Sequence, residues 1–173
     1  MLIEISLMQR FVLLLGSPIY SLSVVLAVLL AATGVGSLTV GFLDKMKKSS
    51  EPALTYLTTL LVIYLVVLTF AGTRIYDFFM QFSFIARILL VSGIIFPIGM
   101  LLGTFFPSGL RLISRNHQDT IAWAWGINCG FSVLGLILSI IIAQFQGFNV
   151  VIVLACVLYL FALLSFRKML RTL

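Results

Sequence analysis

The stretch Thr120–Phe166 reads TIAWAWGINCGFSVLGLILSIIIAQFQGFNVVIVLACVLYLFALLSF, and it decides the fold. It contains no charged side chain, from Asp119 on one side to Arg167 on the other. A helix needs about 20 apolar residues to cross a bilayer, so this stretch is too long for one span and suits two. The polar, glycine-containing segment 144–149 (QFQGFN) marks the turn between them. Because two such helices cannot remain in water, the sequence predicts an integral membrane protein.

The composition of the chain points the same way. Hydrophobic residues make up 62% of its 173 residues and charged residues 9%, whereas a soluble domain carries about 25% charged residues. The length fits a single membrane domain over residues 1–173, with no room for a soluble catalytic domain beside it. We therefore expect an all-α, polytopic helix bundle in contact with the lipid bilayer.

Charge-free runs divide the chain into five predicted full transmembrane helices, at 18–42, 53–71, 88–110, 121–143 and 148–166. Ser17 suits a helix N-cap and Pro18 the first helical position, so the first full span is expected to begin there. Residues 1–8 (MLIEISLM) form a short N-terminal apolar segment that cannot cross a bilayer. We expect it to be either the end of a span whose beginning is missing or a short interfacial helix.

Basic residues set the predicted orientation. The chain has 11 Lys and Arg residues and a net charge of +6. Most of them occupy every second connection between spans: Lys45, Lys47, Lys48, Arg111, Arg115, Arg167, Lys168 and Arg171. The positive-inside rule then places these connections and the C-terminus on the cytoplasmic side of the membrane. Since the basic residues form short clusters rather than a basic arm, we expect no nucleic-acid partner.

Three stretches resemble a known family. They are residues 2–18 (LIEISLMQRFVLLLGSP), residues 106–112 (FPSGLRL) and residues 123–135, which contain WAWGIN and SVLG. They are similar to the membrane region of the bacterial multi-pass spermidine synthase-like proteins, which fuse transporter-like and aminopropyltransferase-like parts. The chain departs from that family at Ser17, where His is expected, and at Cys129, where Gly or Ala is usual.

The family name implies aminopropyl transfer. This sequence shows no nucleotide-fold domain, with its Gly-rich turn and acidic partner, to hold decarboxylated adenosylmethionine. We therefore expect no catalytic residue and no cofactor in this chain. Cys129 and Cys156 lie inside predicted spans without the spacing of metal ligands, so no metal site is expected either.

Residues 36–48 (GSLTVGFLDKMKK) also resemble the loop that joins the second and third helices in each half of a major facilitator superfamily transporter. That resemblance implies one six-helix half, with Asp44 and Lys45 as a gating charge pair. As the alternative, these residues are interfacial anchors. Because such transporters place their site between two halves, the chain would need a second half, which a homodimer could supply.

Two polar residues in apolar runs are candidate functional groups. Glu4 is an ionisable residue in an apolar segment, and its expected partner is Arg10 or Gln9; the alternative is a position at the membrane interface. Asn128 lies in the middle of a predicted helix, where its amide needs a hydrogen-bond partner. It is expected either to form an interhelical packing bond or to line a polar cavity with Trp125.

Small residues four apart form three faces that allow another helix to approach closely. These helix-packing pairs are Ala32 with Gly36, Gly99 with Gly103, and Gly126 with Gly130. Since polar groups for a transport path are few, the sequence favours a non-catalytic membrane subunit that docks on other membrane subunits through these faces. The alternatives are a half-transporter that works as a dimer for a polyamine or other small solute, and a fragment of a fused aminopropyltransferase-like membrane protein.

Overall fold

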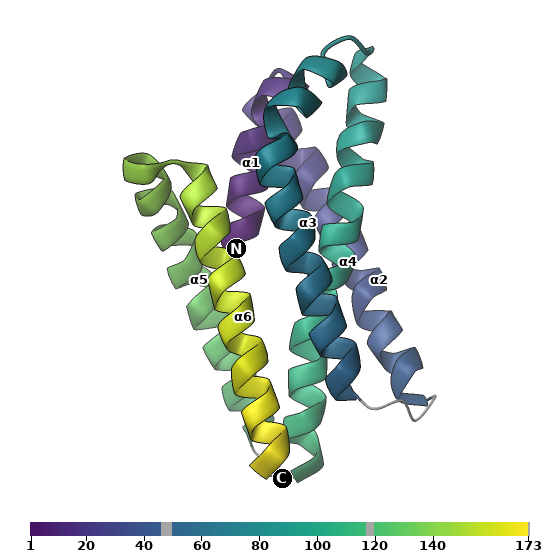
Figure 1. The fold of residues 1–173 in the computed structure, drawn as a ribbon, viewed down its shortest axis with the longest axis vertical. Coiled ribbons are helices and arrows are strands. Elements are labelled where there is room, and N and C mark those ends of the chain that lie inside the picture. The colour runs from purple at the N-terminus through teal and green to yellow at the C-terminus, as the bar shows by residue number, and fades with distance from the viewer. Residues whose placement is uncertain (46–49, 117–119, 173) are drawn as a thin grey trace.

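The chain folds as a bundle of helices (Figure 1). The computed structural model describes residues 1–45, 50–116 and 120–172, and their side chains except at 42–45, 50–53, 71–77, 112, 115–116 and 169–172. These ranges contain six helices and no strand. The helices are α1 (Leu2–Leu15), α2 (Pro18–Lys45), α3 (Ser50–Phe79), α4 (Phe84–Asn116), α5 (Ile121–Gln146) and α6 (Phe148–Thr172). The predicted all-α class is therefore confirmed for the part described.

Four helices contain segments that are long and apolar enough to cross a membrane. These segments are Pro18–Gly41 in α2, Phe84–Arg111 in α4, Ile121–Gln146 in α5 and Phe148–Lys168 in α6. Among the described residues, α3 contributes a shorter apolar stretch, Leu54–Phe70. The chain is thus a multi-pass membrane protein in contact with lipid, but the predicted count of five full spans is not matched.

The turns between helices follow the local sequence. Gly16 ends α1 with a φ of 73°, and its N–H donates to the carbonyl of Val12 at 2.9 Å. The Ser17 hydroxyl oxygen then accepts a hydrogen bond from the N–H of Ile19 at 3.3 Å, so Ser17 caps α2 as predicted. Gly147, with a φ of 83°, separates α5 from α6 inside the predicted turn. Glycine suits both turns because a positive φ is strained for other residues.

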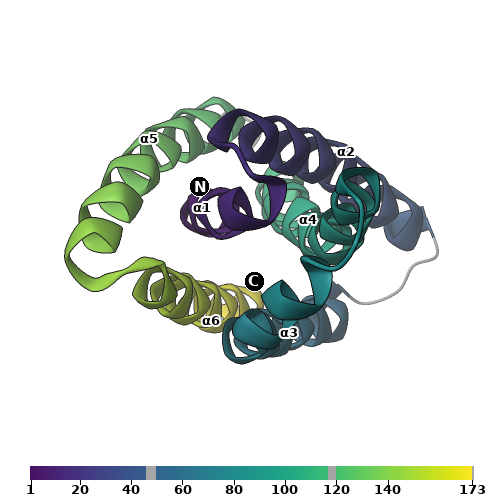
Figure 2. The same ribbon diagram turned by 90° about the horizontal axis from the view of Figure 1, so that it is seen from above.

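Helix α1 lies inside a ring formed by the other helices (Figure 2). It packs against α2, α4, α5 and α6, and Leu7 and Leu14 on it are fully buried. The helix continues without a break through Gln9 and Arg10, so it extends beyond the predicted apolar segment 1–8. At 1.5 Å per residue, its 14 residues span about 21 Å, less than the ~30 Å of a hydrocarbon core. Its N-terminal end therefore stops midway along the bundle (Figure 1).

The most extensive helix contact in the fold joins α2 to α4. A Cβ atom added at Gly99 would lie 2.6 Å from the Cβ of Ala32, and Cβ atoms added at Gly36 and Gly103 would collide with the opposite backbone. The small residues thus allow the two backbones to touch. Two of the predicted small-residue faces pack against each other within the chain and are not free to bind another protein.

The third small-residue face lies on α5 and is open. A Cβ atom added at Gly126 or Gly130 would meet nothing within 4 Å. The rest of the fold covers α5 less than any other candidate span. Only 11% of the apolar 18-residue stretch that marks α5 as a span is buried. Its main contacts are with α6, then with α1 and α4.

Arginine side chains join neighbouring helices near the ends of the bundle. The contacts are Arg87 on α4 with the Leu14 carbonyl (3.4 Å), Arg111 on α4 with the Val40 carbonyl (2.8 Å) and Arg167 on α6 with the Thr55 hydroxyl (3.0 Å). Arg87 also donates to the carbonyls of Met80 and Phe82, which follow α3. Each guanidinium therefore satisfies an oxygen on another helix while remaining near the membrane surface.

Candidate functional site

A cavity of about 410 Å³ lies inside the ring at the N-terminal end of α1. Residues of α2, α4, α5 and α6 line it together with the first turn of α1. The volume lies within the range of about 300–1,000 Å³ that is typical of small-molecule sites. Its walls are mainly apolar, from Leu29, Leu30, Leu102, Phe131 and Leu158 among others.

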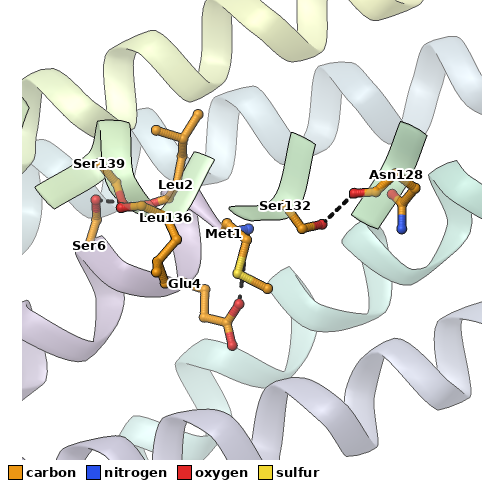
Figure 3. Close-up of polar contacts among 8 residues, drawn as sticks. All are labelled: Met1, Leu2, Glu4, Ser6, Asn128, Ser132, Leu136 and Ser139. Atoms are coloured by element: carbon orange, nitrogen blue, oxygen red, sulfur yellow. Dashed lines mark hydrogen bonds and ion pairs between the residues drawn. The ribbon is translucent and has the colours of Figure 1, made fainter. Parts of the chain in front are cut away.

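The first turn of α1 places Glu4 at the cavity (Figure 3). The side chain of Glu4 is 17% exposed, and its Oε2 lies 4.0 Å from the amino nitrogen of Met1. That separation is longer than a hydrogen bond, which brings nitrogen and oxygen to about 2.7–3.2 Å. Among the residues that the structure describes, the Glu4 carboxylate forms this ion pair and no hydrogen bond. The carboxylate can therefore accept hydrogen bonds from a group in the cavity.

Helix α5 brings Asn128 to the same cavity. The main-chain carbonyl of Asn128 accepts a hydrogen bond from the Ser132 hydroxyl at 2.7 Å, one turn further along (Figure 3). Its side-chain amide makes no hydrogen bond to any residue that the structure describes. The amide thus retains both its donor and its acceptor capacity for a ligand.

Hydroxyl groups in and near the cavity are bonded to their own helices. Thr33 and Ser132, which line it, donate to the carbonyls of Leu30 and Asn128. Ser6 and Ser139 nearby donate to the carbonyls of Leu2 and Leu136 in the same manner (Figure 3). Such bonds satisfy the hydroxyl hydrogen within one helix. These serine and threonine donors are therefore already in use.

Tyr159 on α6 adds an aromatic wall to the cavity. Its ring packs against that of Phe105 with the centroids 5.0 Å apart. Its hydroxyl makes no hydrogen bond within the described residues. Together with Glu4 and Asn128, it gives the cavity three polar groups that come from three helices and are free of hydrogen bonds in that part of the chain.

The expected pair between Glu4 and Arg10 is not formed. Arg10 donates instead to the main-chain carbonyl of Leu68 on α3, at 3.2 Å, and to the side-chain oxygen of Asn149 on α6. Six residues separate Glu4 from Arg10, which corresponds to about 240° around a helix. The two side chains must therefore leave α1 on different sides, and Arg10 serves to join α1 to α3 and α6.

The remaining candidate residues do not join the cavity. Trp125 is exposed and packs against Phe106 of α4, with ring centroids 4.7 Å apart and an interplanar angle of 71°. It does not line the cavity with Asn128, although residues three apart are neighbours on a helix surface. The side chain of Asp44, and hence the predicted pair with Lys45, lies outside the described residues.

Sequence reasoning missed part of the site. Ser132 follows Asn128 by four residues and so shares its helix face, which makes it recognisable in principle. Thr33 and Tyr159 carry no such signal, since they reach the cavity only through helix packing.

The described residues contain no group of three or more His, Cys, Asp or Glu side chains that could hold a metal ion. No protein-family model, curated protein or solved structure matches the chain.

Proposed function

We propose that the chain binds a small solute inside its helix bundle and acts as one half of a membrane transporter. The observation that supports this function is the meeting of Glu4 from α1 and Asn128 from α5 at one cavity. Neither side chain has a hydrogen bond to the described remainder of the chain. Polar groups at membrane depth are costly unless they have a partner, so a solute with matching groups would stabilise the site.

The proposed setting is a bacterial inner membrane with the C-terminus in the cytoplasm. The chain contributes five spans and the shorter α1, and its second half is a second copy or a separate membrane protein. The basic ends of α2, α4 and α6 lie at one end of the bundle (Figure 1), which agrees with this orientation. We further propose kinship with the membrane module of spermidine synthase-like proteins, on the strength of the three sequence stretches alone.

The packing of α2 on α4 favours a solute site over the docking function that the sequence favoured. That function was expected to use three small-residue faces for docking on other subunits. Gly36, Gly99 and Gly103 are already covered within the chain. The cavity, by contrast, provides the polar groups that a solute site requires.

Solute uptake by proteoliposomes tests the proposed transporter. We would measure uptake of radiolabelled amines, amino acids and sugars with the wild type and with Ala162→Phe, which places a large ring into the cavity wall. The matched control is Ala122→Phe on α5, at an exposed alanine away from the cavity. Uptake that Ala162→Phe abolishes and Ala122→Phe leaves intact is the expected result. Absence of protein-dependent uptake for the whole panel would contradict the proposal.

A second candidate function is that of an accessory membrane subunit, which the open Gly126 and Gly130 face favours. Gly130→Leu would then release a stoichiometric membrane partner seen by native mass spectrometry of gently extracted protein. Gly93→Leu is the control, since Gly93 also has nothing within 4 Å but lies on α4. A chain that is found alone, or only with copies of itself, would exclude this candidate.

A further inference from the structure

We infer that the turn between α3 and α4 anchors the protein in the head-group region of the lipid bilayer, where its phenylalanine rings contact lipid and the Arg87 guanidinium takes the place of water. The turn consists of residues 80–83 (MQFS). The cavity is lined by other residues, so this inference goes beyond the proposed transport and does not depend on it.

Aromatic side chains are exposed at this turn. Phe78, Phe82 and Phe84 are between 39% and 56% exposed. The rings of Phe78 and Phe82 pack edge to face with their centroids 5.2 Å apart, and Phe84 packs in the same way on Tyr20 of α2, also at 5.2 Å. Large apolar rings gathered on one surface mark a site of contact with a membrane or with another protein.

The exposed rings continue the lipid-facing surface of α4. Ile85 and Leu89 lie one turn apart on that helix and are 72% and 68% exposed. They belong to the apolar segment Phe84–Arg111, which is long enough to cross the membrane. Since this segment begins directly after the turn, the surface that meets lipid reaches the turn without interruption. The structure therefore favours lipid over a protein as the partner of the turn.

The length of the same segment places the turn among the head groups. At 1.5 Å per residue, its 28 residues extend about 42 Å. A tilt of about 20°, the average for membrane helices, reduces the length across the bilayer to about 39 Å. The hydrocarbon core is about 30 Å thick, and the head groups extend the membrane to about 40–45 Å. With Arg111 among the head groups of one leaflet, Phe84 and the turn reach those of the other.

Arg87 supplies the turn with hydrogen-bond donors. Its Nε donates to the carbonyl of Phe82 at 2.9 Å, and its Nη2 donates to the carbonyl of Met80 at 3.0 Å. The N–H groups of Gln81 and Phe82 donate back to the last two residues of α3, at 3.4 and 3.1 Å. Carbonyls beyond a helix end are normally bonded to water, which is scarcer at the membrane boundary than in bulk solution. The Arg87 bonds allow the turn to lie there without leaving these carbonyls unpaired.

Depth-dependent quenching of tryptophan fluorescence tests the inference. We would introduce Phe82→Trp into the full chain after Trp123→Phe and Trp125→Phe, so that it supplies the only tryptophan. The bilayers would contain phospholipids brominated either near the head group or near the end of the acyl chain, and iodide would serve as the aqueous quencher. The reference is Leu134→Trp in the same background, at an exposed position in the middle of α5.

Fluorescence of Phe82→Trp should be quenched more by bromine near the head group than by bromine at the chain end, and Leu134→Trp should show the opposite order. Iodide should quench Phe82→Trp less than it quenches N-acetyltryptophanamide in the same buffer. Strong iodide quenching without an effect of either brominated lipid would overturn the inference, because the turn would then lie in water. Protection from iodide and from both brominated lipids would also overturn it, because a protein would then cover the turn.

Arg87→Lys in the Phe82→Trp background tests the part assigned to the guanidinium. Lysine keeps the positive charge but carries its donors on one nitrogen, which cannot replace the fork of Nε and Nη2. Iodide quenching of Phe82→Trp should increase as the turn moves toward water, while Arg87→Lys should leave the quenching of Leu134→Trp unchanged. No increase, or an equal increase at both positions, would contradict the role assigned to Arg87.

Discussion

The Cβ atom of Ala32 on α2 points at Gly99 on α4, and a Cβ added to that glycine would lie 2.6 Å from it. Real Cβ atoms do not approach so closely, so hydrogen is the only substituent that fits at residue 99. One turn along in each helix, a Cβ atom added at Gly36 or Gly103 would come even closer to the main-chain carbonyl oxygen of Met100 or Thr33. The close contact between α2 and α4 therefore depends on glycines, which have no side chain. This contact holds together the two helices on one side of α1.

Gly99→Ala should destabilise the bundle by about 1–3 kcal/mol, because the added methyl group forces the two helices apart. Gly93→Ala on the same helix is the matched control, since nothing lies within 4 Å of the added atom. There the substitution should be neutral or stabilising by up to about 1 kcal/mol, because alanine has the higher helix propensity. Unfolding in mixed micelles with increasing SDS measures both. Equal effects of the two substitutions would refute the close packing of α2 on α4.

Tyr64→Phe should destabilise the protein by about 0.6 kcal/mol and by no more than about 1.7, the range for side-chain hydrogen bonds in membranes. The Tyr64 hydroxyl donates to the carbonyl of Ile94 at 3.1 Å. That carbonyl lies in the turn before Pro97, where the ring of the proline disturbs the helix hydrogen bonds of α4. SDS unfolding again provides the measurement. The control is Tyr56→Phe, at an exposed tyrosine of the same helix, which should leave the midpoint unchanged.

Arg10→Met should lower stability more strongly than Gln9→Met. The Arg10 guanidinium joins α1 to the Leu68 carbonyl and to Asn149, whereas the neighbouring Gln9 is exposed. Hydrogen bonds from a charged group contribute about 1.5–3 kcal/mol each, so loss of these bonds should exceed the effect of the control. Thermal unfolding in detergent compares the two variants. A Gln9→Met change as large as that of Arg10→Met would show that Arg10 does not join the helices.

Cysteine labelling should place the two ends of the bundle on opposite sides of the membrane. Starting from Cys129→Ala with Cys156→Ala, we would introduce either Gln146→Cys at the end of α5 or Lys168→Cys near the end of α6, both at exposed positions. A membrane-impermeant maleimide added to intact cells with a permeable outer membrane should label the first variant. The second should react only after the inner membrane is opened, because basic residues remain inside. The reverse pattern would invert the proposed topology.

Much of the fold could be predicted because membrane helices are encoded locally. Charge-free runs fix where helices lie, since the bilayer demands about 20 apolar residues from each span. Ser17 with Pro18 and the glycine at 147 then fix two turns through their own backbone preferences. The predicted count of five full spans was not matched, because α3 contributes a shorter apolar stretch among the described residues.

The placement of α1 could not be predicted from the sequence. A helix inside the ring and a helix at its rim have similar apolar sequences, since lipid and protein interior are both apolar. The bond from Arg10 to Asn149 joins residues that are far apart in the chain, and no local pattern reveals it. For the same reason Glu4 and Asn128 were recognised as separate candidates, while the cavity that unites them emerged only from the packing.

The position of α1 has a consequence for how the protein is made. Ribosomes synthesise α1 before every helix that later surrounds it, and α6, which carries the Asn149 acceptor for Arg10, comes last. Until then Arg10 lacks this acceptor, and exposing an ionised side chain to lipid is unfavourable. The bond from Arg10 to Asn149 can therefore form only after translation of α6 is complete, and until then the Arg10 guanidinium depends on other polar partners.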